Sequence, residues 1–216
     1  MCAAVAAPPE VSLPHISIDR DARVVEFEAR VSPLVHASDP RDDEFPLEQF
    51  VCIPDTKEHE SLLVTDALPS HIHAALLLIG LEPGSPTTWT NLGNRVAVTP
   101  PDGPRVNVEF VHVEDGAERV ISPVEWVRHV EGGEELESKS FVFAGSVIRQ
   151  MNARERYEAD DAGTVIGLAS FGTEVLAWPE LVSHEFDDGD LVWFADLDVI
   201  PPNGTPVTVR LTPVAD

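Results

Sequence analysis

Short segments in which apolar and polar residues alternate, each ending at turn residues, recur along the whole chain. The first two such segments flank the turn at residues 19–22, and apolar side chains occupy every second position on either side of it. These positions are Ile16, Ile18, Val25, Phe27 and Ala29. Period two is the periodicity of a strand with one buried face, so residues 15–31 are predicted to form a β-hairpin.

Five further short strands are predicted in the second half of the chain. They cover residues 141–144, 164–168, 174–177, 191–194 and 207–211. The residues between them include Asp-Gly and Asn-Gly steps, which are typical of turns. Strands therefore outnumber helices, and a mainly antiparallel sheet is expected.

A second hairpin is predicted at residues 48–65, around the turn at 54–56. The pairing register of this hairpin decides which side chains share a face. A two- or four-residue loop places Cys52 opposite His59, whereas a three-residue loop places Cys52 on the face of Glu60. The sequence leaves both registers open.

Residues 70–79 are predicted to form a helix, with Ser70 as its N-cap. Apolar side chains cover nearly its whole circumference, so the helix is expected to be buried. Ser122 and Glu125 form a capping box that opens a short second helix at about 123–129. The predicted fold class is α+β, a mainly antiparallel sheet with one buried helix (about 70–79) and a short second helix (about 123–129).

Acidic residues outnumber basic residues by 38 to 14, and the formal net charge is −24. A field of this sign repels phosphate backbones and anionic headgroups, so neither nucleic acid nor a membrane surface is an expected partner. No apolar run reaches the roughly 18 residues of a membrane-spanning helix, so the mature domain is expected to be soluble. A protein of unknown identity or a small ligand is the expected partner.

The beginning of the chain differs in composition from the rest. Residues 3–7 are all Ala or Val, as at the cleavage end of an export signal. We interpret residues 1–13 as a flexible leader or signal remnant, and residues 14–216 as a single domain. A signal remnant implies a periplasmic or exported protein, and a plain leader implies a cytoplasmic one.

Cys2 and Cys52 are the only cysteines of the chain. A Cys-ligated iron–sulfur cluster uses about four thiolates, so no such cluster can form within one chain. Motifs for nucleotide-binding loops, zinc proteases and serine hydrolases are also absent from the sequence. No cofactor is evident.

Several longer strings of residues resemble the bacterial YdjY-like domain family. They are residues 58–65, 72–84, 141–146, 157–160 and 201–205, and the resemblance spans about residues 48–213. Some members of that family are ferredoxin-type proteins with clusters of cysteines, which implies an accessory role in a redox system. This chain lacks those cysteines, so the resemblance does not extend to the cluster itself.

Five ionisable residues within apolar sequence are the candidate ligand-binding residues. They are Cys52, His59, Glu60, His71 and His73. The two last fall in the first turn of the predicted helix, where the helix dipole favours neutral imidazole, the form that binds a metal or accepts a proton. Cys52, His59 and His73 are the metal candidates. The alternative is that these residues have structural roles only. Cys52 would then be a small core side chain, the histidines of the helix would be hydrogen-bonded within the fold, and His59 would mark the solvated end of a strand.

The absence of a catalytic motif favours a non-catalytic module outside the cytoplasm. It would bind a ligand or a partner through residues 58–61 and the start of the helix at His71. The first alternative is a metal-dependent or thiol enzyme that uses Cys52, His59 and His73. The second alternative is an accessory protein of a redox system.

Overall fold

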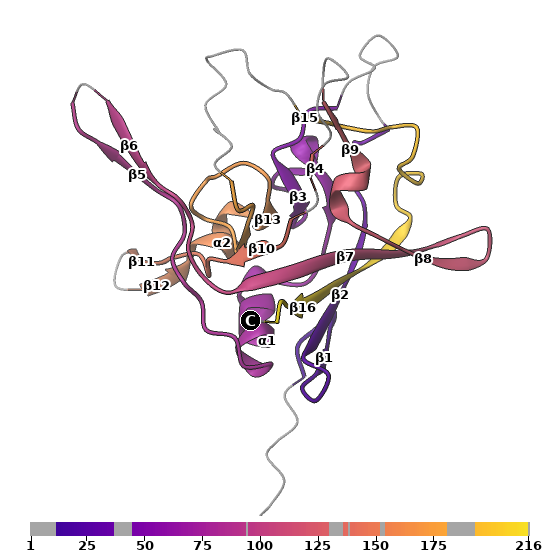
Figure 1. Ribbon diagram of the computed structural model, residues 1–216, viewed down its shortest axis with the longest axis horizontal. Helices are drawn as coiled ribbons and strands as arrows, with labels where there is room; N and C mark the ends of the chain where they lie inside the picture. The colour runs from indigo at the N-terminus through magenta and orange to yellow at the C-terminus, as the bar shows by residue number, and fades with distance from the viewer. Residues whose placement is uncertain are drawn as a thin grey trace, which may run out of the picture.

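Eight strands form one sheet that closes on itself (Figure 1). The computed structural model describes residues 12–36, 45–93, 95–129, 136–137, 139–151, 154–180 and 193–215. In pairing order the strands are β2 (Val24–Val31), β16 (Pro206–Pro213), β7 (Arg105–Glu114), β10 (Phe141–Phe143), β14 (Leu176–Ala177), β13 (Thr164–Gly167), β3 (Gln49–Cys52) and β4 (Ser61–Val64). The ring closes because β4 also pairs with β2, Arg30 opposite Val64 and Val31 opposite Leu63.

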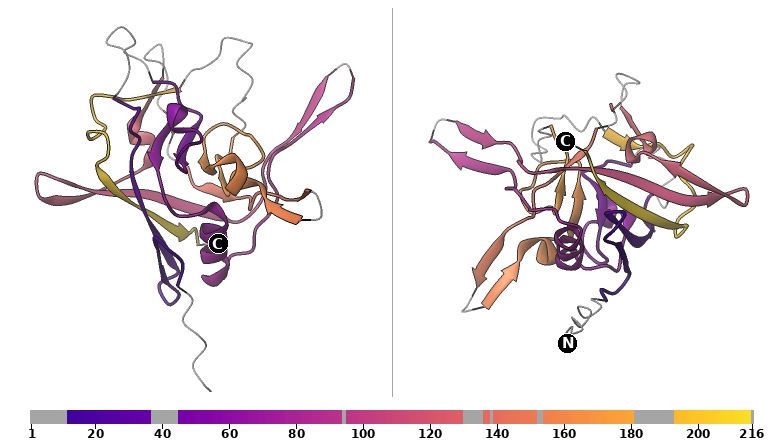
Figure 2. Two further views of the ribbon diagram at one scale, coloured as in Figure 1. Left: turned by 180° about the vertical axis from the view of Figure 1, so that it is seen from behind. Right: turned by 60° about the horizontal axis from the view of Figure 1, so that its bottom comes forward.

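Other strands extend this sheet or stand beside it. β1 (Ile16–Asp19) pairs with β2, and β8 (Ala117–Ile121) pairs with β7. The small two-stranded sheets are β5 (Thr88–Asn91) with β6 (Val96–Thr99), β9 (Val127–His129) with β15 (Trp193–Ala195), and β11 (Ile148–Met151) with β12 (Arg154–Tyr157). The β5–β6 and β7–β8 hairpins project from the body in opposite directions (Figures 1 and 2).

Aromatic side chains from strands that are not neighbours meet inside the closed sheet. The ring centroid of Phe50 on β3 lies 5.4 Å from that of Phe141 on β10 and 6.0 Å from that of Trp178. All three side chains are buried. Two strands, β13 and β14, separate β3 from β10 in the sheet. These contacts therefore cross the interior, and the opposite sides of the sheet share one core.

The predicted α+β fold class is wrong. The chain is mostly β, with 45% of residues in strands and 13% in helices. The helical segments are α1 (Pro69–Leu78), α2 (Glu158–Ala162), and the 3-10 helices η1 (Glu58–Glu60) and η2 (Pro123–Trp126). Because the sheet closes, the inner faces of its strands cover one another, and no helix is needed to cover an open sheet.

α1 matches the predicted helix at residues 70–79, but it is not buried all round. It contacts β1, β2 and α2, while Leu77 on its other side is 45% exposed. The second helix begins as predicted, because the Glu125 carboxylate accepts the N–H of Ser122 at 2.7 Å. It ends at Trp126 instead of about 129, since Val127–His129 form β9 and pair with β15.

The first predicted hairpin is confirmed, and the second is wrong. Ile16 pairs with Phe27 across β1 and β2, in the expected antiparallel register. β3 and β4, however, are parallel, and Cys52 lies opposite Val64. The chain between them turns at residues 54–57, where the Glu58 carboxylate accepts the N–H of Thr56 at 2.9 Å, and then forms η1. Neither hairpin register that the sequence allowed applies.

The later predicted strands correspond to β10, β13, β14 and β16. Of the strand predicted at 191–194, the structure describes residues 193–194 as part of β15, and residues 191–192 lie outside the described ranges. The predicted leader at 1–13 also lies outside them, apart from residues 12 and 13. Within the described ranges, no helix has the length and apolar character to cross a membrane.

The N-terminus of α1 is capped from another helix. The sequence predicts Ser70 as N-cap, but the N-cap position is Leu68, and the Asp160 carboxylate on α2 accepts the N–H of Ser70 at 2.8 Å. Asp160→Ala is therefore expected to lower the free energy of unfolding, measured in urea, by about 1 kcal/mol. Asp161→Ala is the control, because its exposed pair with Arg156 contributes only about 0.5 kcal/mol. Equal losses in the two variants would contradict the capping role.

Candidate functional site

Cys52 is a free, fully buried thiol at the end of β3. It lies opposite Val64 on β4 and Thr164 on β13, so a paired strand flanks it on each side. Burial raises its pKa to about 11, so it carries its proton near neutral pH. Nucleophilic attack and metal ligation both use the thiolate. In this environment Cys52 acts as a small core side chain.

Glu60 belongs to a buried pair of carboxyl groups. Glu60 is 7% exposed and Glu48 is 4% exposed, and the Glu48 N–H donates to the Glu60 carbonyl at 3.0 Å. The Lys57 ammonium donates to the Glu60 carboxylate. Burial raises the pKa of Glu48 to about 8, and the hydrogen bond to Glu60 and its negative charge act in the same direction. The Glu48 carboxyl is therefore largely protonated near pH 7 and donates to Glu60.

His59 lies on η1 with an exposed side chain, and its Nε2 is 3.6 Å from the Glu60 carboxylate. His71 lies in the first turn of α1. Its Nδ1 is buried, with no hydrogen-bond partner in the described part of the chain. The two histidines thus lie on different elements, one beside the carboxyl pair and one at the start of the helix.

His73 forms a polar contact between α1 and the end of β12. Its Nδ1 is 2.8 Å from the hydroxyl of Tyr157, which donates to the Gly145 carbonyl at 3.0 Å. The imidazole also meets the ring of Phe143 edge-on, with centroids 5.0 Å apart. Burial lowers the pKa of His73, which supports the predicted neutral form. Burial of the imidazole is the largest cause of this shift.

The structure does not gather the five predicted residues into one site. His59 and Glu60 are in contact, Cys52 is enclosed between strands, and His73 faces Tyr157. Over the described ranges, no three His, Cys, Asp or Glu side chains form a group that could hold a metal ion. Cys52, His59 and His73 therefore form no such group.

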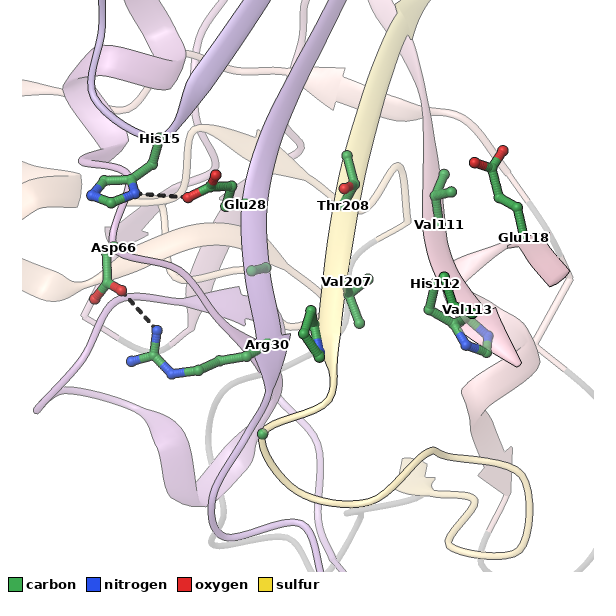
Figure 3. A pocket seen from close by; sticks show the side chains of 13 residues that line it. His15, Glu28, Arg30, Asp66, Val111, His112, Val113, Glu118, Val207 and Thr208 are labelled. Atoms are coloured by element: carbon green, nitrogen blue, oxygen red, sulfur yellow. Dashed lines mark hydrogen bonds and ion pairs between the residues drawn. The ribbon is translucent and has the colours of Figure 1, made fainter. Parts of the chain in front are cut away.

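A groove of about 550 Å³ lies on the outer face of the closed sheet, across β2, β16 and β7 (Figure 3). Thr208 on β16 lies in its middle, because it pairs with Glu28 on β2 and with Val111 on β7. Glu118 on β8 and Gly204, in the loop before β16, also line the groove. It is built entirely from residues outside the set that the sequence predicted.

One hydrogen-bonded pair and one ion pair line one side of the groove (Figure 3). His15 Nδ1 lies 2.9 Å from Glu28 Oε2, and Arg30 Nη1 lies 2.8 Å from Asp66 Oδ2. These side chains are exposed, so each pair stabilises the fold by less than about 1 kcal/mol. Glu118 lies on the other side, beyond β7 (Figure 3). Carboxylates therefore face the groove from both sides.

His112 on β7 is a buried imidazole in the groove wall. It is 6% exposed, and its ring centroid lies 5.5 Å from that of Trp126. Its Nδ1 has no hydrogen-bond partner among the described residues. Buried polar atoms without a partner are rare in folded proteins. The imidazole lies on the same face of β7 as Phe110, whose ring also contacts Trp126, so Nδ1 is shielded from the solvent in the groove.

Sequence reasoning missed this groove because its residues come from segments far apart in the chain and form no motif. β2, β16 and β7 become neighbours only through long-range pairing. The one local signal is the alternation along β2, where Glu26, Glu28 and Arg30 alternate with the buried residues Val25, Phe27 and Ala29. That signal identifies an outer face, but it does not identify the strands beside it.

The structure is a β domain with a groove of about 550 Å³ on its surface. The model of the YdjY domain family matches residues 16–212, and the chain belongs to this family. The match runs from the start of β1 almost to the end of β16, so it covers the closed sheet and the strands that form the groove. No curated protein and no solved structure matches the chain.

Proposed function

We propose that this YdjY domain is a non-catalytic module that binds a ligand or partner in the outer groove. The observation that carries the proposal is the groove itself, whose lining joins apolar and charged residues of β2, β16, β7 and β8. The volume of about 550 Å³ falls within the roughly 300–1,000 Å³ of small-molecule sites. Such sites combine apolar walls with a few polar groups, and here Val111 and Val113 lie between Thr208 and Glu118.

The state of Cys52 and of the groove carboxylates supports a binding role over a thiol enzyme. A thiol nucleophile is activated by a lowered pKa or by an adjacent base. Burial instead raises the pKa of Cys52, and the thiol lies between paired strands. In the groove, the Glu28 and Asp66 carboxylates are engaged by His15 and Arg30.

Thr208→Trp is expected to abolish binding in the groove, because the indole fills its middle. Thr208 faces outward, so the change in the free energy of unfolding should stay within about 0.5 kcal/mol. The measurement is a fragment library titrated into the full chain, read from two-dimensional amide NMR spectra. In the unaltered protein, fragments should shift the signals of Thr208, Val111 and Arg30.

Two further variants make this test specific. Thr212→Trp places the same indole farther along β16, opposite Asn107 and outside the groove lining, and should leave fragment binding unchanged. His112→Phe keeps a ring beside Trp126 on the inner face of β7, and should also leave fragment binding unchanged. Fragments that bind elsewhere, or that bind all variants equally, would refute the proposed site.

A further inference from the structure

We infer that copies of this chain associate head to tail, with the β7–β8 hairpin of one copy packed against the β5–β6 and β11–β12 hairpins of the next. The inference goes beyond the proposed function, because it assigns a surface for a protein partner. The β7–β8 hairpin is called the acidic arm below, and β5–β6 together with β11–β12 is called the basic end. The placement, the charges and the exposed apolar side chains of these hairpins carry the inference.

The two surfaces lie at opposite ends of the molecule. Its longest axis runs horizontally in Figure 1, with the basic end on the left and the tip of the acidic arm on the right. Both views in Figure 2 also place the two hairpins of the basic end on one side of the body. Contact between different surfaces of identical chains is heterologous, so each added copy leaves one surface of each kind free for the next.

The hairpins at both ends lack a third strand. β5 and β6 pair only with each other among the described strands, as do β11 and β12, and β8 pairs only with β7. A two-stranded hairpin alone is marginally stable in water, and a further strand or a packed face stabilises it. These hairpins therefore have free edges and faces that a neighbouring copy can cover.

The two ends differ in charge, although acidic residues outnumber basic residues by 38 to 14 in the whole chain. At the basic end, residues 83–101 contain no Asp or Glu, and residues 148–157 contain three arginines and one glutamate. The acidic arm carries Glu114, Asp115 and Glu118 against Arg119. Acid is thus excluded from one end and concentrated at the other, so the two ends attract each other.

Each end has charged side chains outside the ion pairs found among the described residues. Two arginines of β11–β12 are engaged by acidic residues of α2. Arg95, in the β5–β6 turn, and Arg154, at the start of β12, belong to no such pair. On the acidic arm, Asp115 and Glu118 belong to none either. Two cations near the tips of one end therefore match two carboxylates on the other.

Exposed apolar side chains lie beside these charges at both ends. Val96 and Ile148 on the basic end are 50% and 68% exposed, and Val113 and Val120 on the acidic arm are 68% and 46% exposed. The two valines of the arm share a face with Glu118, which pairs with Val113. Contact between the ends removes these side chains from water, which contributes about 25 cal/mol for each Å² buried.

A second copy of the chain is the partner that these observations favour, because the chain itself has both halves of the contact. The hairpins also limit the repulsion between two bodies of net charge −24. A strand of four residues extends about 13 Å, whereas salt at physiological strength screens charges beyond about 8 Å. The tips can thus meet while the bodies stay apart. Few side chains take part, so the affinity is expected to be micromolar or weaker.

Sedimentation equilibrium of the full chain, at physiological ionic strength and rising protein concentration, measures this association. The average mass should rise with concentration and pass the mass of a dimer, because each complex keeps a free end of each kind. Val96→Glu with Ile148→Glu puts acidic groups on the basic end, and Val113→Lys with Glu118→Lys puts basic groups on the acidic arm. Each double variant should weaken self-association at least about tenfold, because like charges then meet.

A mixture of the two double variants tests the head-to-tail arrangement. Each variant keeps one unaltered end, so the mixture should form at least a one-to-one complex at concentrations where either variant alone is monomeric. Formation of this complex also shows that both variants are folded. Leu77→Glu is the control, because Leu77 is exposed on α1, which lies at neither end (Figure 1). It should associate like the parent.

Four results would overturn the inference. The first is a parent chain that stays monomeric at every concentration, and the second is a loss in Leu77→Glu as large as in the double variants. The third is a double variant that associates as strongly as the parent, which would mean that the copies meet through one and the same surface. The fourth is a mixture of the two double variants that stays monomeric.

Discussion

Replacing Phe50 with alanine is expected to lower the free energy of unfolding by about 3–5 kcal/mol. The ring of Phe50 meets those of Phe141 and Trp178 across the interior of the closed sheet. Removal of the ring leaves a cavity between strands that are fixed by their pairing on both sides, so the walls can collapse only in part. Urea denaturation of the purified chain gives the measurement.

Leu77→Ala is the control for this substitution. Leu77 lies on the outer side of α1 and is 45% exposed, so its loss should stay below about 1 kcal/mol. A loss for Phe50→Ala no greater than that for Leu77→Ala would show that Phe50 does not lie in a core shared by opposite sides of the sheet.

The stability of the protein is expected to depend on pH through Glu48. The folded chain holds the Glu48 proton up to a pKa of about 8, whereas the unfolded chain releases it near the ordinary value of 4.5. Between these two values the folded state binds more protons, so the free energy of unfolding falls as the pH rises. The slope from one such group is about 1.4 kcal/mol per pH unit, which amounts to a few kcal/mol over the window.

Glu48→Gln isolates this contribution. The amide does not titrate, and its NH₂ group can donate to Glu60 as the protonated carboxyl does. The variant should match the parent near pH 5 and exceed it by at least about 2 kcal/mol near pH 8.5. Glu155→Gln, on the exposed strand β12, should follow the parent at every pH. A constant difference between Glu48→Gln and the parent across this range would mean that Glu48 is not protonated in the fold.

Local pattern was enough to predict structure where neighbours in sequence are neighbours in space. The β1–β2 hairpin and the position of α1 follow from period-two and helical patterns with turn residues between them. The β3–β4 pair fails the same reasoning, because Leu63 pairs with Val51 in parallel and with Val31 in antiparallel fashion. The direction and register of β4 depend on both of its partners, β2 and β3, and only β3 is close to it in the sequence.

The candidate site residues were likewise predictable singly, but their partners from distant segments were not. The sequence indicated Cys52 and Glu60 as ionisable residues within apolar segments, and both side chains are buried in the structure. It did not indicate Glu48 as the partner of Glu60, because the two meet through parallel pairing of their strands. The groove around Thr208 depends on pairings between residues more than 90 positions apart, which no local pattern encodes.

Interstrand nuclear Overhauser contacts test the closure of the sheet most directly. Contacts between Arg30 and Val64, and between Cys52 and Val64, are expected, because β4 pairs with β2 and runs parallel to β3. Contacts between Cys52 and His59, with none between Arg30 and Val64, would show an antiparallel hairpin at the edge of an open sheet and would contradict this fold.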